Sequence, residues 1–226
     1  MRSLSSSRLA PGLGLAYVVL VAINIVGFGG GNPPDPAATA EQIRATYAAH
    51  HIGYTLGPVL DGLGSILLVG FFYILARRAE ARWGVVAPIA IVGAILVSAL
   101  DLLWAGALWT AVQLSLLNAN AESVKAMVYL SQGILGVIGV PLAVTYVAIG
   151  IASVRVRSLP IWFGWTAIVI GALALTAVIA TSFSTTASAL AFVSYILSLV
   201  WLIAVAIYLL ARPERGTTDL PAAPWP

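Results

Sequence analysis

The chain has no cysteine and few charged residues. Among its 226 residues, 8% are charged and 61% are hydrophobic, whereas an ordinary soluble domain has roughly 25% charged residues. A mean hydropathy of +1.01 leaves long apolar stretches that a single soluble core could not bury. The absence of cysteine also excludes a disulfide framework and a thiolate metal site. The composition therefore predicts an integral membrane protein.

Long apolar runs are what the sequence has in abundance. Six of them can each cross roughly 30 Å of hydrocarbon at about 1.5 Å per helical residue. They cover residues 13–31, 54–75, 85–112, 124–154, 160–180 and 189–211. The first run is longer than the apolar part of a secretory signal and no A-x-A cleavage pattern follows it, so we expect it to be retained. The sequence predicts an all-α, polytopic transmembrane bundle of about six spanning helices. Residues 1–212 form its single domain, and residues 213–226, rich in proline and alanine, form a disordered tail.

The positive charges lie in short clusters between the apolar runs. With six crossings, nine basic residues fall on the side of the two termini, and only Arg44 and Lys125 fall on the other side. By the positive-inside rule, we expect both termini to be cytoplasmic. This pattern explains the basic balance without a nucleic-acid partner, so membrane lipids are the expected surroundings. Ten of the eleven basic residues are arginine, a bias that fits a bacterial chain from a GC-rich genome. We therefore expect a multi-pass protein of a bacterial inner membrane.

The first external connection is long enough to hold structure of its own. Asp35 followed by Pro36 is a favourable N-cap and first-turn pair. Residues 37–51 contain strong helix formers, with Ile43 and Tyr47 at helical spacing. The sequence predicts a short surface helix that lies on the outer end of the bundle as a lid, with partner binding as the alternative role.

Three stretches of the chain resemble a known family. Residues 35–40 read Asp-Pro-Ala-Ala-Thr-Ala, and the second run ends at residues 73–78 in Tyr-Ile-Leu-Ala-Arg-Arg. Residues 155–165, between the fourth and fifth runs, read Arg-Val-Arg-Ser-Leu-Pro-Ile-Trp-Phe-Gly-Trp. These stretches resemble the bacterial membrane family labelled domain of unknown function 4386. The resemblance implies a compact six-helix membrane protein with no established activity, and it supplies no catalytic residue.

Asp61 and Asp101 are the two acids within the predicted spans. A charged residue at the centre of a spanning helix costs about 2.5 to 3.5 kcal/mol on insertion scales, so such residues usually face the bundle interior and mark a site. Counted from the inner boundary, these two lie at depths of roughly 24 and 27 Å. Their helices are antiparallel neighbours because the connection is short, so we expect the acids to approach each other in the outer half. Two neighbouring carboxylates in a low dielectric cannot both ionise cheaply, and one should then hold a proton.

Other polar residues lie near the acids by the same count. The candidate ligand- or proton-binding residues are Asp61, Asp101, Asn24, Ser65, Ser98, Thr176 and Tyr195. The two serines lie one helical turn from the acids, where their hydroxyls could hydrogen-bond the carboxylates. The alternative is that each acid is protonated and hydrogen-bonded and serves only to join helices.

Three functions are compatible with these residues. The first is a small transport or ligand-binding protein whose acids bind a cation, a proton or a small lipophilic ligand. The second is a membrane-embedded enzyme that protonates a lipid or isoprenoid, while Trp104, Trp201 or Tyr195 stabilises cationic charge. The third is a non-catalytic accessory or regulatory protein. Whether the chain forms a homo-oligomer stays open.

Familiar enzyme motifs are missing from the sequence. It has no phosphate loop, nucleophile elbow, dinucleotide fingerprint or H-E-x-x-H pattern. His50 and His51 are adjacent, and neighbouring helix positions point about 100° apart, which is poor geometry for binding one metal ion. We therefore expect no metal and no cofactor, and a function other than catalysis is favoured.

Overall fold

The computed structural model describes residues 6–28, 38–83, 86–157, 159–181, 183 and 188–211. These residues form eight helices and, within those ranges, no strand. The helices are α1 (Ser6–Phe28), α2 (Ala40–Ala49), α3 (His51–Trp83), α4 (Val86–Leu116), α5 (Ala121–Val137), α6 (Gly139–Val156), α7 (Ile161–Thr181) and α8 (Ser188–Ala211). The predicted all-α architecture is therefore confirmed. The predicted tail, residues 213–226, lies outside the described residues.

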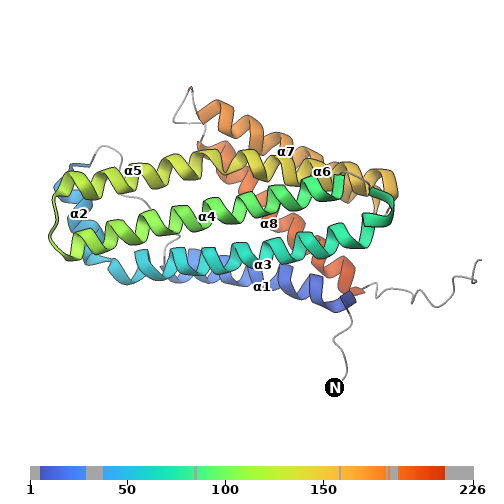
Figure 1. Cartoon of the computed structure of the whole chain (residues 1–226), viewed down its shortest axis with the longest axis horizontal. Coiled ribbons are helices and arrows are strands. Elements are labelled where there is room, and N and C mark those ends of the chain that lie inside the picture. Colours follow the sequence, from blue (N-terminus) through green and yellow to red (C-terminus); the bar gives the residue numbers. More distant parts are fainter. Residues whose placement is uncertain are drawn as a thin grey trace, which may run out of the picture.

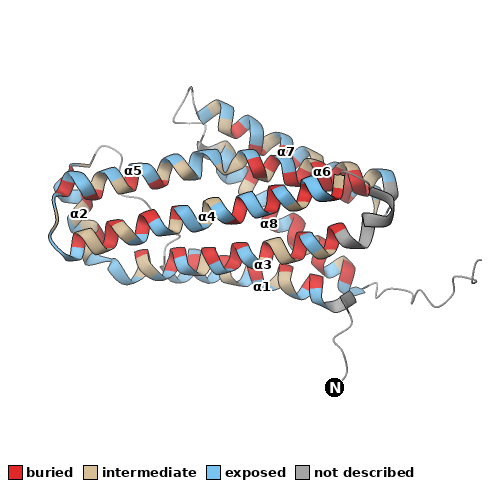
Figure 2. Ribbon diagram, viewed as in Figure 1, coloured by how far each residue is buried: buried red, intermediate tan, exposed pale blue. Residues whose placement is uncertain are grey.

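Six helical segments are long and apolar enough to cross a membrane, as predicted. They belong to α1, α3, α4, α5 with α6, α7 and α8. Their outward faces carry large exposed apolar side chains, and Figure 2 shows exposed positions along the helices. Examples are Val19, Ile23, Leu63, Ile66, Ile95, Leu103, Leu130, Val144, Val169, Ile179, Val200 and Ile207. A helix satisfies its backbone hydrogen bonds internally, so these faces are suited to hydrocarbon and not to water.

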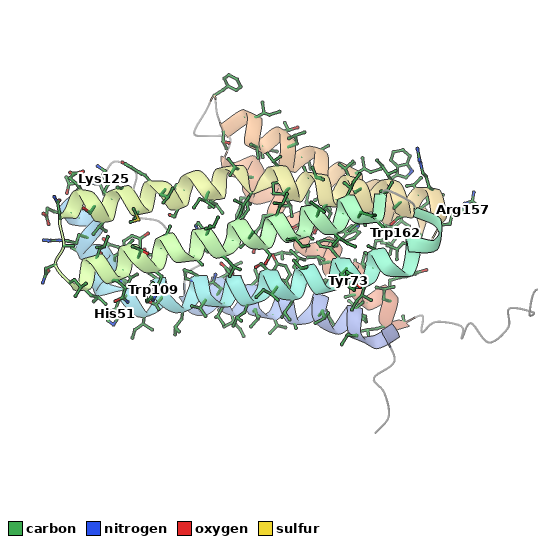
Figure 3. The ribbon with its side chains drawn as sticks, viewed as in Figure 1. His51, Tyr73, Trp109, Lys125, Arg157 and Trp162 are labelled. Carbon is green, nitrogen blue, oxygen red and sulfur yellow. The ribbon has the colours of Figure 1, made fainter. Side chains whose placement is uncertain are left out.

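The spanning segments pack in chain order into a closed ring. α1 packs on α3, α3 on α4, α4 on both α5 and α6, α6 on α7, and α7 on α8, which returns to α1. Figure 1 shows α1 beginning and α8 ending at one end of the bundle, which we call the terminal end. α2 lies at the opposite end, which we call the α2 end. In Figure 3, exposed Trp109 lies near the α2 end and exposed Trp162 near the terminal end, as expected for aromatic side chains at two membrane interfaces.

The tightest helix pair is α6 with α7, where glycines let the two backbones meet. A Cβ atom added at Gly150 would lie 2.6 Å from the carbonyl oxygen of Gly164, and one added at Gly164 would lie 2.9 Å from the carbonyl oxygen of Gly150. Small residues commonly allow such close approach between membrane helices. Gly171 extends this close contact, because a Cβ atom added there would lie 2.9 Å from the carbonyl oxygen of Ala143.

The fourth predicted run is divided in the structure. Residues 124–154 were expected to form one span, but α5 ends at Val137 and α6 begins at Gly139. Pro141 has no backbone N–H, so it cannot donate to the carbonyl of Val137, and a helix commonly kinks at such a position. The two helices together still form one crossing of the bundle.

The predicted surface helix exists as α2, but it begins later than expected. Thr39 is its N-cap, and Gln42 donates from its backbone N–H to the Thr39 hydroxyl at 3.3 Å. The Gln42 side chain in turn accepts from the Thr39 backbone N–H at 2.8 Å. This reciprocal capping box satisfies two free N–H groups. The expected start at Asp35 and Pro36 is therefore corrected to Ala40, and those two residues lie outside the described ranges.

The buried face of α2 covers the α2 end of the ring. Ile43 and Tyr47 are fully buried, and the Arg44 guanidinium donates to the carbonyl oxygen of Ala119 at 3.1 Å. α2 packs against α5, α4 and the start of α3. The predicted position of this helix as a lid on the bundle agrees with these contacts.

Candidate functional site

The two intramembrane acids lie where two apolar clusters meet. The larger cluster fills the terminal half of the ring, and the smaller one fills the α2 end. On α3, Asp61 lies seven residues after Tyr54 of the smaller cluster and seven before Leu68 of the larger one. On α4, Asp101 lies one turn before Trp104 of the smaller cluster. The acids therefore share one level of the bundle, as their depth in the sequence predicted.

The two carboxyl groups interact and have no basic partner in the described part of the chain. Both side chains are half-buried, and Asp101 lies close enough to Asp61 for their charges to interact. The Asn24 amide of α1 donates from Nδ2 to Asp61 Oδ2 at 2.7 Å. The ion pair found among the described residues joins Arg44 to Glu41 at the surface instead. The acids are thus buried together without the compensating cation that buried charges usually need.

Glycines on α3 give the polar side chains of α1 access to Asp61. Gly57 and Gly64 lie four residues before and three residues after Asp61, on the same helix face. A Cβ atom at Gly57 would lie 2.5 Å from Asn24 Oδ1, and one at Gly64 would lie 3.1 Å from a ring carbon of Tyr17. Asn24 and Tyr17 are two turns apart on α1, so the two helix faces fit together along this contact.

Asn24 carries an unpaired acceptor beside the acids. Its side chain is only 3% exposed, and its Oδ1 atom has no hydrogen-bond partner. A buried polar atom without a partner costs about 1 to 3 kcal/mol. The carbonyl oxygen is therefore available to accept a hydrogen bond from a proton-bearing group at this site.

A series of tyrosine hydroxyls extends from the acids towards the terminal end. Tyr195 of α8 lies within electrostatic range of both carboxyl groups and of Tyr17. Tyr146 of α6 lies close to both tyrosines, and its hydroxyl donates to the carbonyl oxygen of Ser198 at 3.3 Å. The polar layer therefore includes side chains from α1, α3, α4, α6 and α8.

Three of the predicted site residues make other contacts. The Ser65 hydroxyl donates to the carbonyl oxygen of Gly62 at 2.9 Å and lies 3.0 Å from the Ser98 hydroxyl. The two serines thus join α3 to α4, and the predicted hydrogen bonds to the carboxylates do not form. Thr176 is exposed on α7, and its hydroxyl donates to the carbonyl oxygen of Ala172 at 2.9 Å. Counting residues predicted a depth for Thr176 but could not predict the direction in which its side chain points.

Four residues of the site were not singled out from the sequence. For three of them a signal was present, because Tyr17 shares the face of Asn24, and Gly57 and Gly64 share the face of Asp61. Nothing in the sequence indicated Tyr146, because its neighbours belong to helices far away along the chain.

The two tryptophans considered for an enzyme lie in the apolar clusters. Trp201 Nε1 donates to the carbonyl oxygen of Phe163 at 2.9 Å, and its ring packs edge-to-face on Tyr146 with 5.3 Å between centroids. Trp104 is buried among the residues of the smaller cluster. These contacts give both tryptophans a packing role.

The described residues offer no metal site built from three or more histidine, aspartate or glutamate side chains. The Nδ1 atom of His50 lies 3.2 Å from the carbonyl oxygen of Thr46, and that of His51 lies 3.0 Å from the carbonyl oxygen of Ala48. Both histidines are exposed at the junction of α2 and α3. They bind the backbone of their own helix ends, which agrees with a solvated pair.

An apolar cleft lies apart from the acids, between α4 and α6. It has a volume of about 450 Å³ and faces the surroundings of the bundle. Its lining residues are Pro88, Ile89, Val92, Gly93, Leu96, Leu100, Val140, Pro141 and Val144. Neither acid lines this cleft, so it is not the site of their chemistry.

Comparison with protein-family models, with curated proteins and with solved structures found no match to this chain. The resemblance to the family labelled domain of unknown function 4386 stays a prediction.

Proposed function

We propose that this chain is a small membrane transport protein that binds a proton between Asp61 and Asp101. The observation that carries the proposal is the pairing of the two carboxyl groups. They come from the neighbouring helices α3 and α4, lie at one level of the bundle, and meet no basic side chain in the described ranges. Two such groups in a low-dielectric environment cannot both be ionised cheaply, so one of the two acids holds a proton.

The surroundings of the acids suit a proton better than a larger ligand. Apolar clusters bound the site on both sides along the bundle. A proton needs no cavity, and the apolar cleft of about 450 Å³ does not reach the acids. The unpaired Asn24 Oδ1 atom supplies an acceptor for a protonated group. With the termini on the cytoplasmic side, as the arginines predict, the site lies in the outer half of the membrane.

The first prediction concerns proton movement in purified protein reconstituted into liposomes. A trapped pH-sensitive dye reports proton entry after a pH jump, with valinomycin and potassium compensating the charge. We expect wild-type vesicles to acidify faster than empty ones. We expect Asp61→Asn and Asp101→Asn each to lower the rate by about tenfold or more, because each removes an ionisable group from the proton-binding pair. The double variant should match empty vesicles.

A matched control is Glu122→Gln, which removes an exposed acid at the start of α5. Asparagine resembles a protonated aspartate in shape and charge, so both site variants should fold, which thermal unfolding in detergent checks. Dicyclohexylcarbodiimide, which reacts with protonated carboxyl groups in apolar surroundings, supplies a second measurement by mass spectrometry. Folded site variants that carry protons at the wild-type rate, together with unlabelled acids in the wild type, would show the proposal to be wrong.

A further inference from the structure

The amide group of Asn24 contacts one of the two acids and not the other. Its Nδ2 atom donates to Asp61 Oδ2 at 2.7 Å, the short end of the range for an N–H···O hydrogen bond. Within the described ranges, no hydrogen bond reaches the carboxyl group of Asp101. The two acids therefore have different surroundings, although they share one level of the bundle.

We propose that Asn24 is a positioning residue that gives the two acids different roles: its amide keeps Asp61 ionised, and Asp101 holds the exchangeable proton. This inference rests on the proposed function, because it names which of the two acids binds the proton. A hydrogen bond donated to a carboxylate is stronger than one donated to a neutral carboxyl group, so it favours the ionised form. The negative charge of Asp61 then disfavours a second charge on Asp101, which keeps its proton.

The packing of α1 on α3 holds the amide in this position. Asn24 is 3% exposed, so bulk water does not compete with Asp61 for its N–H group. On the other side of the amide, a Cβ atom at Gly57 would lie 2.5 Å from Asn24 Oδ1. An ionised carboxylate can only accept hydrogen bonds, so the amide must turn its N–H group towards Asp61 and its oxygen away. The lack of a partner for Oδ1 therefore follows from the orientation that an ionised Asp61 requires.

The other titratable groups in this layer are neutral. They are the phenol side chains of Tyr17 on α1, Tyr146 on α6 and Tyr195 on α8, and a phenol is uncharged near pH 7. The described basic side chains lie at the two ends of the bundle, away from the acids; they are Arg44, Lys125, Arg155 and Arg157. In the described part of the chain, the hydrogen bond from Asn24 is thus the contact that distinguishes the two carboxyl groups.

The experiment measures which acid reacts with dicyclohexylcarbodiimide at pH 7, by peptide mapping of the wild type and of Asn24→Leu. Leucine is close to asparagine in size and branching but cannot donate a hydrogen bond. We expect Asp101 to carry most of the label in the wild type. In Asn24→Leu, the ratio of Asp61 label to Asp101 label should rise about tenfold, because Asp61 loses the bond that favours its ionised form.

The matched control is Ser65→Ala, one helical turn from Asp61. It breaks the 3.0 Å contact between the Ser65 and Ser98 hydroxyls, which also joins two helices beside the acids, but it leaves Asn24 in place. Its labelling ratio should equal that of the wild type. Gly57→Ala is a second test variant, because its added methyl group displaces the amide without removing it. It should shift the ratio in the same direction as Asn24→Leu.

Labelling and proton entry together separate failure of this inference from failure of the proposed function. Thermal unfolding in detergent identifies the variants that fold. An unchanged ratio in the folded Asn24→Leu or Gly57→Ala variant, or preferential labelling of Asp61 in the wild type, would overturn the role of Asn24 and leave the proton site intact. An equal rise in Ser65→Ala would also overturn it, because the effect would then come from loosened packing. Absence of both labelling and proton entry in the wild type would overturn the proposed function itself.

Discussion

At the scale of single residues, Tyr47 carries a buried hydroxyl that lowers the stability of the α2 end. Its side chain is completely buried, and its ring stacks on Tyr54 with 4.3 Å between centroids. Its hydroxyl has no hydrogen-bond partner. Burial raises the pKa of Tyr47 well above its ordinary value, and the nearby Tyr54 raises it further. The ring stabilises the contact of α2 with the bundle, while the hydroxyl opposes it.

Removing that hydroxyl should stabilise the protein. We expect Tyr47→Phe to raise the free energy of unfolding by about 1 kcal/mol at pH 8, because no hydrogen bond is lost. Above pH of about 10, an unfolded tyrosine ionises while the folded one stays neutral, so the wild type loses stability as the pH rises through this range. The advantage of the variant should therefore grow between pH 8 and pH 11. Thermal unfolding in detergent at the two pH values measures it.

Tyr129→Phe is the matched control, because Tyr129 is 50% exposed at the same end of the bundle. A Tyr47→Phe variant that is less stable than the wild type at pH 8 would show that the hydroxyl has a partner. If the free energies of unfolding of Tyr47→Phe and the wild type differ by the same amount at pH 8 and pH 11, Tyr47 ionises normally.

At the scale of helices, the contact of α1 with α3 creates the site. Asp61 reaches Asn24 only because Gly57 leaves room for the amide, and Gly64 leaves room for Tyr17. The register of the two helices is therefore fixed by polar and small residues as well as by apolar packing. Adding a single methyl group to this face of α3 should therefore disturb the contacts of the acid pair.

Gly57→Ala tests this packing directly. The new Cβ atom would lie 2.5 Å from Asn24 Oδ1, so the amide must move away from Asp61 or the helices must separate. We expect a loss of about 1 to 3 kcal/mol in the free energy of unfolding, the usual cost of overpacking. Proton entry in liposomes should fall as well, because Asn24 no longer donates to Asp61.

The control for this variant is Gly106→Ala on α4, where no atom lies within 4 Å of the added Cβ. Its stability should stay within about 1 kcal/mol of wild type and move upward, because alanine favours helix over glycine. Equal stability and equal proton entry in Gly57→Ala and the wild type would contradict the packing argument.

The depth of a residue along a helix could be predicted from the sequence, but the direction of its side chain could not. Depth counting placed Asp61, Asp101, Asn24 and Tyr195 at one level, and the structure brings these four together. The same count placed Thr176 there, but its helix turns it outward. Rise per residue follows from helix geometry alone, whereas the direction of a side chain depends on which neighbours the helix packs against.

At the scale of the whole molecule, the ring of six spans has its ends on the same side. An even number of crossings requires this, and α1 begins where α8 ends (Figure 1). The distribution of arginines predicts that this side is cytoplasmic. In a bacterial host, green fluorescent protein fused at the C-terminus should therefore fluoresce. Alkaline phosphatase fused after Asn118, at the α2 end, should be active.

The matched controls exchange the two reporters, so that phosphatase at the C-terminus is inactive and the fluorescent protein after Asn118 is dark. The opposite result for both pairs would reverse the predicted orientation and place the acids in the inner half. Activity of one reporter at both ends would contradict six crossings.

The sequence by itself determined that this chain is a six-span membrane bundle. The length of each apolar run and its near absence of charge are local properties, and they decide whether a helix can span the hydrocarbon core. It also determined that two acids lie at one depth. Only the tertiary structure decided which side chains surround them. Tyr17 and Tyr146 join the polar layer that contains the acids, and Thr176 does not, since rotation and pairing of helices depend on packing among segments far apart along the chain.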